Sequence, residues 1–143
     1  MRTLLENLAA WARSARVAYA HCDVPCGIYH PHAAELGAET VEKMVEKLQA
    51  LGPDDGSLAW RNSAARMIVT KEQHAELVKR EVAIIWGDYF KPENAGKFPD
   101  LHTTVWQILK LASFNKQNVD MAKAGELRAA VKQFADMFWE SKK

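Results

Sequence analysis

The sequence predicts an all-α protein built as an antiparallel four-helix bundle, and three observations lead to this fold class. Apolar residues recur at intervals of three and four along four separate segments, as in helices that bury one face. No segment shows a convincing alternation of apolar and polar residues with the period of two that is typical of a strand. Short connections rich in proline, glycine or asparagine separate the segments, and helices joined in this way pack as antiparallel neighbours.

The first two helices are predicted over residues 33–51 and 60–89. One face of the first helix carries Val41, Met44, Val45 and Leu48. Gly52 and Pro53 then end the pattern, because neither residue favours the continuation of a helix. The inward stripe of the second helix contains Met67, Lys71, His74, Val78, Val82, Ile85 and Tyr89.

The last two helices are each preceded by an aspartate that is suited to cap a helix start. Residues 91–99 contain two prolines and a glycine, so we expect a second break between helices there. Asp100 is the expected cap of the third helix and Asp120 that of the fourth. The apolar stripe of the third helix is Leu101, Val105, Ile108, Leu109 and Ala112. That of the fourth is Met121, Ala124, Leu127, Val131, Phe134 and Phe138.

The composition is that of one globular domain without nucleic-acid or membrane character. The chain has 143 residues and a formal net charge of +1, which gives no reason to expect a nucleic acid or an anionic membrane as partner. No apolar run approaches the roughly 20 residues that a membrane-spanning helix needs. The chain has only two cysteines, too few for a secreted disulfide scaffold, so we expect a reducing, cytoplasmic location.

The first twenty residues differ from the rest, and two interpretations of them stay open. Leu4, Leu5, Leu8 and Trp11 recur at helical spacing, as in an ordinary N-terminal helix. The small-residue step Ala-Tyr-Ala at 18–20 is instead typical of a cleavage site. Charged residues interrupt any apolar core of a secretory signal, so a removable pro-segment fits better than an export signal.

Both cysteines lie in the stretch HCDVPCG (21–27), whose proline and glycine allow the backbone to curl. Thiolates are soft ligands for transition metals. If the bond between Ala20 and His21 is intact, the stretch offers two sulfurs and one imidazole, an incomplete set for tetrahedral zinc. If the bond is cut, the His21 amine, the amide nitrogen and sulfur of Cys22, and the sulfur of Cys26 can form a plane. A square-planar set with nitrogen donors indicates Ni(II) or Cu(II).

The pattern His-Cys-Asp-x-Pro-Cys-Gly-x-Tyr (21–29) resembles the nickel hook of the nickel-type superoxide dismutases. The likeness continues through KEQHAEL (71–77), WGDYFKP (86–92) and FWESKK (138–143), and so covers nearly all of the chain after the first twenty residues. It implies conversion of superoxide to dioxygen and hydrogen peroxide by cycling between Ni(II) and Ni(III), with one nickel ion per subunit. It also implies a homohexamer and a processing protease that exposes the histidine.

The resemblance divides the chain into a removable pro-segment (1–20), a nickel-binding hook (21–32) and a four-helix bundle (33–143). The metal ligands that it implies are His21, Cys22 and Cys26. Tyr29 would stand over the open face of the metal and limit approach to small anions. Asp23 would hold the hook by hydrogen bonds, and Tyr89 would lie in the outer shell of the site.

The chain departs from the family's pattern at Gly37 and His74. Better-known members place a glutamate that holds the axial histidine at the first position, and an arginine that holds this glutamate at the second. Both partners differ together here, so no unpaired buried charge is left. His74 is expected to face inward, where it would either hold water beside His21 or fill space.

Two alternative functions use the same hook. A helical oligomer could bind or deliver a metal without turning over superoxide. A thiol redox protein could form a reversible disulfide between Cys22 and Cys26, and it would need neither a metal nor a free amine at His21. The combined motifs favour the dismutase over both.

Overall fold

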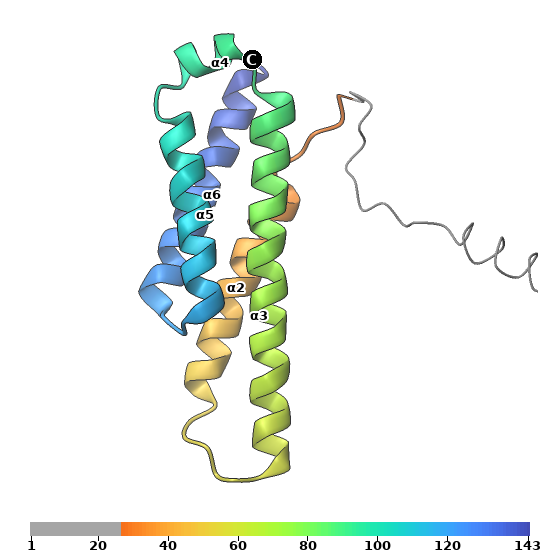
Figure 1. Cartoon of the computed structure of the whole chain (residues 1–143), viewed down its shortest axis with the longest axis vertical. Helices are drawn as coiled ribbons and strands as arrows, with labels where there is room; N and C mark the ends of the chain where they lie inside the picture. Colours follow the sequence, from red (N-terminus) through yellow and green to blue (C-terminus); the bar gives the residue numbers. More distant parts are fainter. Residues whose placement is uncertain (1–26) are drawn as a thin grey trace, which may run out of the picture.

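The computed structural model describes residues 27–143, and within them four long helices form an up-and-down antiparallel bundle (Figure 1). α2 packs against α3 and α6, and α5 packs against the same two helices, so α2 and α5 lie on a diagonal. Within this range no strand occurs, and the all-α prediction is confirmed. The long helices are α2 (His32–Ala50), α3 (Leu58–Ile84), α5 (Leu101–Gln117) and α6 (Met121–Ser141).

The predicted apolar stripes form the core of the bundle. Almost all of their aliphatic and phenyl side chains are buried, and the remaining ones are half-buried. The two predicted ranges, 33–51 and 60–89, agree within two residues at each end with α2 and with α3 continued by η1. α5 and α6 run on past the last apolar residue of each predicted stripe. None of the helices between His32 and Ser141 combines the length and the apolar character that crossing a membrane requires.

Two of the helix boundaries test the predicted caps. The Asp120 carboxylate accepts a hydrogen bond from the Lys123 N–H at 3.0 Å, so the cap of α6 is confirmed. Asp100 precedes α5 as predicted, but its side chain makes no capping hydrogen bond. Its backbone is already helical, with φ −86° and ψ 0°, whereas a capping residue usually has extended backbone. Asp100 therefore occupies the predicted position before α5, but the prediction that its side chain caps the helix is wrong.

The segment predicted as a break does separate the second and third long helices, but it contains a short helix, α4 (Pro92–Lys97), that was not predicted. Pro92 suits the first helical position because that position needs no N–H donor. The Lys91 N–H donates to Asn94 Oδ1 at 2.8 Å, while the Asn94 N–H donates to the Lys91 carbonyl at 2.9 Å. These two local bonds start the helix despite the composition of the segment.

The second long helix ends in a widened, π-helical turn, η1 (Ile85–Tyr89). The Phe90 N–H donates to the carbonyl of Ile85, five residues earlier, at 3.3 Å. The helix therefore reaches Tyr89 as predicted, but it changes pitch over its last five residues. π-Helical turns are rare in proteins, and those that occur are often found at functional sites. This turn sets the position of Tyr89.

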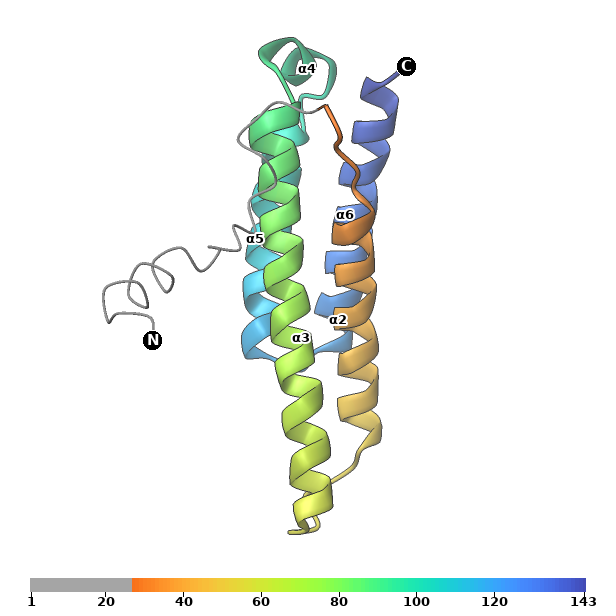
Figure 2. The ribbon, with the colours of Figure 1, turned by 90° about the vertical axis from the view of Figure 1, so that its right-hand side faces the viewer.

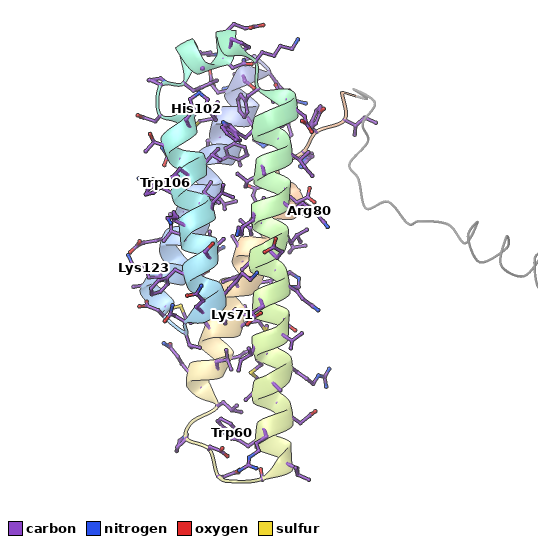
Figure 3. All side chains as sticks on the ribbon, in the orientation of Figure 1. Trp60, Lys71, Arg80, His102, Trp106 and Lys123 are labelled. Carbon is purple, nitrogen blue, oxygen red and sulfur yellow. The ribbon has the colours of Figure 1, made fainter. Side chains whose placement is uncertain are left out.

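Lys71 belongs to the inward stripe and is almost fully buried, with 1% of its side chain exposed. Its ammonium group donates hydrogen bonds to the carbonyl oxygens of Asn115, Lys116 and Asn118, where α5 ends (Figure 3). Burial lowers the pKa of Lys71 from its usual value. The carbonyl groups at a helix end lack partners within the helix and favour a cation, so Lys71 fastens the end of α5 to α3.

Gly37 lies in α2 where this helix crosses α3. Among the described glycines, it is the one at which an added Cβ atom would meet its neighbours at the shortest distance. A Cβ atom at this position would lie 2.9 Å from Val78 Cγ2 and 3.2 Å from the carbonyl oxygen of His74. The second neighbour is backbone and cannot turn aside. The glycine therefore permits a close crossing of the two helices.

We expect Gly37→Ala to lower the free energy of unfolding, because the added methyl overpacks this crossing at a cost of about 1–3 kcal/mol. Better helix propensity offsets about 1 kcal/mol of that cost. The matched control is Gly125→Ala in α6, where the nearest atom to the added Cβ is Glu42 Oε1 at 3.9 Å. Urea unfolding followed by circular dichroism should give Gly37→Ala a lower free energy of unfolding than the parent. Gly125→Ala should be at least as stable as the parent. Equal stability of the two variants would contradict the close crossing.

Candidate metal centre

The described end of the predicted hook, residues 27–32, lies against the end of the bundle where η1 and the last turns of α6 meet (Figure 2). The Tyr29 ring centroid is 5.6 Å from that of Tyr89. The His30 ring lies edge-on to Trp139, with 4.9 Å between the centroids. The hook therefore joins the bundle beside an aromatic cluster.

Four of the predicted site residues lie outside the described part of the chain. They are His21, Cys22, Asp23 and Cys26. Their roles therefore stay predictions. Between Gly27 and Lys143, no group of three or more His, Cys, Asp or Glu side chains is arranged to hold a metal ion.

Tyr29 and Tyr89 are the two predicted site residues that the structure describes, and it brings them together. Both are half-buried. The Tyr89 ring also contacts Phe138 and Phe90, with centroid distances of 4.6 Å and 5.2 Å. Tilted and edge-on aromatic contacts of this kind are favourable and restrict the ring to one orientation.

A lysine covers the outer side of this aromatic cluster. The Lys142 ammonium lies 4.7 Å from the Phe138 ring centroid and 5.7 Å from that of Tyr89. A cation is attracted to the face of an aromatic ring. Lys142 therefore places a positive charge beside the tyrosine pair, at the end of the bundle where the hook joins it.

Ser141, the last residue of α6, is a contact of Tyr89 that sequence reasoning missed. Its Oγ lies 2.8 Å from the phenol oxygen of Tyr89 and 2.6 Å from the carbonyl oxygen of Phe138. Ser141 lies within the motif FWESKK, but no local pattern links it to a residue 52 positions earlier. Only the packing of η1 against α6 brings the two hydroxyl groups together.

Gly37 and His74 are neighbours across the α2–α3 crossing, as a pair of replaced partners should be. His74 is half-buried rather than turned fully inward. Its Nδ1 donates to the Thr70 carbonyl at 2.8 Å, so this nitrogen carries a proton. His74 also lines a shallow surface hollow of about 350 Å³ with Gln73, Glu76, Leu77 and Arg80.

The Gly37–His74 pair and the tyrosine pair occupy different levels of the bundle. His74 precedes Tyr89 by 15 residues on nearly continuous helix, which places their backbones about 22 Å apart along the axis. The position of His21 relative to either pair lies outside the described residues.

Comparison with known proteins gives consistent similarities over most of the chain. Residues 16–142 match the family described as nickel-containing superoxide dismutase. The nickel superoxide dismutase of Streptomyces coelicolor is 41% identical over 124 residues, which cover 87% of this chain and 89% of that protein. The corresponding protein of Streptomyces seoulensis is 40% identical over the same length.

Solved structures agree with this similarity. The native structure of a nickel superoxide dismutase superposes with a TM-score of 0.75 at 38% identity, covering 86% of this chain and 100% of that one. Structures of variants of such an enzyme also match. They replace a histidine at the first position, an aspartate at the third or a tyrosine at the ninth, with TM-scores of 0.72, 0.76 and 0.74.

Proposed function

This chain belongs to the nickel-containing superoxide dismutase family, and we propose that it acquires its metal centre when cleavage after Ala20 makes His21 the first residue. It is an oxidoreductase that acts on superoxide and uses nickel as its cofactor. In the proposed centre the ligands are the amine and imidazole of His21, the amide nitrogen and thiolate of Cys22, and the thiolate of Cys26.

One observation supports this assignment above the others. When His21 is counted as the first residue, Asp23 is the third and Tyr29 the ninth. These are the residue types and positions that were substituted in the solved variants. The agreement supports His21 as the mature N-terminus and Asp23 and Tyr29 as members of the site.

The chemistry of the donor set fits nickel. Thiolates and nitrogen donors in one plane suit Ni(II), whereas zinc prefers a tetrahedron. Nickel held by these residues would supply one-electron redox chemistry, which suits the conversion of two superoxide ions and two protons to dioxygen and hydrogen peroxide. Cys22 and Cys26 bind as anions, and their negative charge favours the higher oxidation state.

The other residues of the proposed site control access to the metal, orient water and hold the hook in place. Tyr29, held against Tyr89, limits access to the centre to small anions and orders water that can carry protons. Asp23 fixes the hook by hydrogen bonds. The Lys142 charge beside the tyrosine pair favours approach of an anion to this end of the bundle.

We also propose the organisation that goes with this function. Residues 1–20 form a pro-segment that a protease removes, residues 21–32 form the hook, and residues 33–143 form the bundle. The mature subunits assemble as a homohexamer in the cytoplasm. Exposed aromatic side chains on the bundle support an assembly, and Trp106 on α5 has 60% of its surface exposed (Figure 3).

Metal removal tests the function against its two rivals. The chain that begins at His21 should lose superoxide turnover when a chelator removes nickel, and should regain it with Ni(II) but not with Zn(II), because zinc has no accessible redox change. Its circular dichroism should not change, since the buried core lies among residues 34–138 and contains none of the proposed ligands. Superoxide turnover by metal-free protein would support a thiol redox protein, and nickel binding without turnover would support a metal-delivery protein.

A further inference from the structure

Ser141 lies between two oxygen atoms, and the chemistry of one of them fixes the direction of its hydroxyl group. The carbonyl oxygen of Phe138 lies 2.6 Å from Ser141 Oγ, a distance typical of a strong O–H···O hydrogen bond. A carbonyl oxygen carries no proton, so Ser141 must donate in this bond. A serine hydroxyl has only one proton. Toward Tyr89, at 2.8 Å, Ser141 can therefore only accept, and the Tyr89 phenol donates.

Donation in the opposite direction, from the Ser141 hydroxyl to the Tyr89 oxygen, is unfavourable. If the Ser141 proton pointed to Tyr89, two oxygen atoms would face each other at 2.6 Å with no proton between them. The Phe138 carbonyl is also one of the last four of α6, which lack partners in a regular helix. Lys142, four residues further on, donates its N–H to the carbonyls of Trp139 and Glu140 instead. The Ser141 hydroxyl therefore satisfies the Phe138 carbonyl.

The Tyr89 ring cannot readily turn to another partner. Phe138 and Phe90 pack against it, and Tyr29 approaches it from the hook. Rotation of the ring would break these contacts. The phenol oxygen therefore stays within reach of Ser141, and the direction of its proton is set by the tertiary structure.

We propose that Ser141 is a positioning residue that holds the phenol proton of Tyr89 in the hydrogen bond between the two hydroxyl groups. With its proton given to Ser141, the Tyr89 oxygen can only accept further hydrogen bonds. Tyr89 then orients a donor, either water or the Tyr29 hydroxyl, and the proton that reaches peroxide comes from that donor. This consequence for turnover rests on the proposed function, whereas the direction of the hydrogen bond does not.

The test compares Ser141→Thr with Ser141→Val, which have nearly the same shape and differ in the hydroxyl group. The first readout is the phenol C–O stretching band of Tyr89 in the full chain with ring-labelled tyrosine, which distinguishes a phenol that donates from one that does not. Subtraction of the spectrum of Tyr89→Phe identifies the band. We expect the parent and Ser141→Thr to show a donating phenol and Ser141→Val to lose this signature.

The second readout is superoxide turnover by the same variants in the nickel-loaded chain that begins at His21. We expect unchanged nickel content and a loss of about 10-fold in rate for Ser141→Val, as for other groups that orient residues around a metal, with recovery in Ser141→Thr. Ser141→Ala serves as a second variant without the hydroxyl if Ser141→Val does not fold.

Each outcome decides the proposal. Identical Tyr89 bands in the Thr and Val variants would overturn the hydrogen-bond direction. A shifted band with an unchanged rate would overturn the role in turnover. If the parent itself fails to turn over superoxide, the proposed function fails, but the infrared comparison still decides the role of Ser141 toward Tyr89.

Discussion

A Cys26→Ser protein should lose both nickel binding and superoxide turnover while its helices remain intact. The loss follows from the ligand chemistry, because a serine hydroxyl is a hard and neutral donor that does not replace a thiolate on a soft metal. The helices should remain because Cys26 precedes α2, which begins at His32, and because the core lies among residues 34–138. The same reasoning applies to Cys22→Ser.

Nickel content per chain and the rate of superoxide turnover measure this effect, with circular dichroism as the check on folding. A matched control is Met44→Leu, which removes the single sulfur atom in α2 and should leave the nickel content unchanged. Turnover at the parent's rate in Cys26→Ser would show that this ligand is assigned incorrectly.

Much of the fold could be predicted because apolar residues recur at helical intervals along the chain, and this recurrence determines which face of each helix is buried. The four stripes define the buried faces of α2, α3, α5 and α6, and even Lys71 was placed on the correct face. The remaining features depend on short-range geometry that the period does not record. α4 forms through the local bonds of Asn94 in a segment whose composition suggests a break. The widened turn before Phe90 also leaves no mark on the apolar pattern.

The candidate site shows the same limit. The hook could be interpreted because its ligands are adjacent in sequence, so that spacing alone describes their chemistry. Ser141 could not be found in this way, since its partner Tyr89 lies on another helical segment. Gly37 was recognised only as a departure from the family's pattern. Its contact distance to the backbone of α3 shows that it also permits the close crossing of two helices.

The uncleaved chain should be inactive even when nickel is supplied. With the bond to Ala20 intact, the His21 nitrogen belongs to a peptide group, and its lone pair is delocalised into the carbonyl. Such a nitrogen is a poor donor, and the twenty preceding residues would occupy the space in which the hook closes around the metal. Cleavage converts the nitrogen to an amine whose pKa in model peptides is about 8, low enough for a metal to displace its proton.

The fully buried core of the bundle lies among residues 34–138, after the hook, so we expect the bundle to form whether or not cleavage has occurred. Both forms of the protein should therefore fold into the same bundle. A difference in activity between them can then be attributed to the N-terminal amine and to the freedom of the hook, and not to a failure of folding.

The most direct measurement is superoxide turnover by two nickel-treated proteins, the 143-residue chain and the chain that begins at His21. Nickel content and circular dichroism should be recorded on the same samples. We expect one nickel ion per chain and rapid turnover for the form that begins at His21, and neither for the full chain. Equal turnover by the two forms would contradict the proposed centre, because the full chain lacks the amine ligand on which that centre depends.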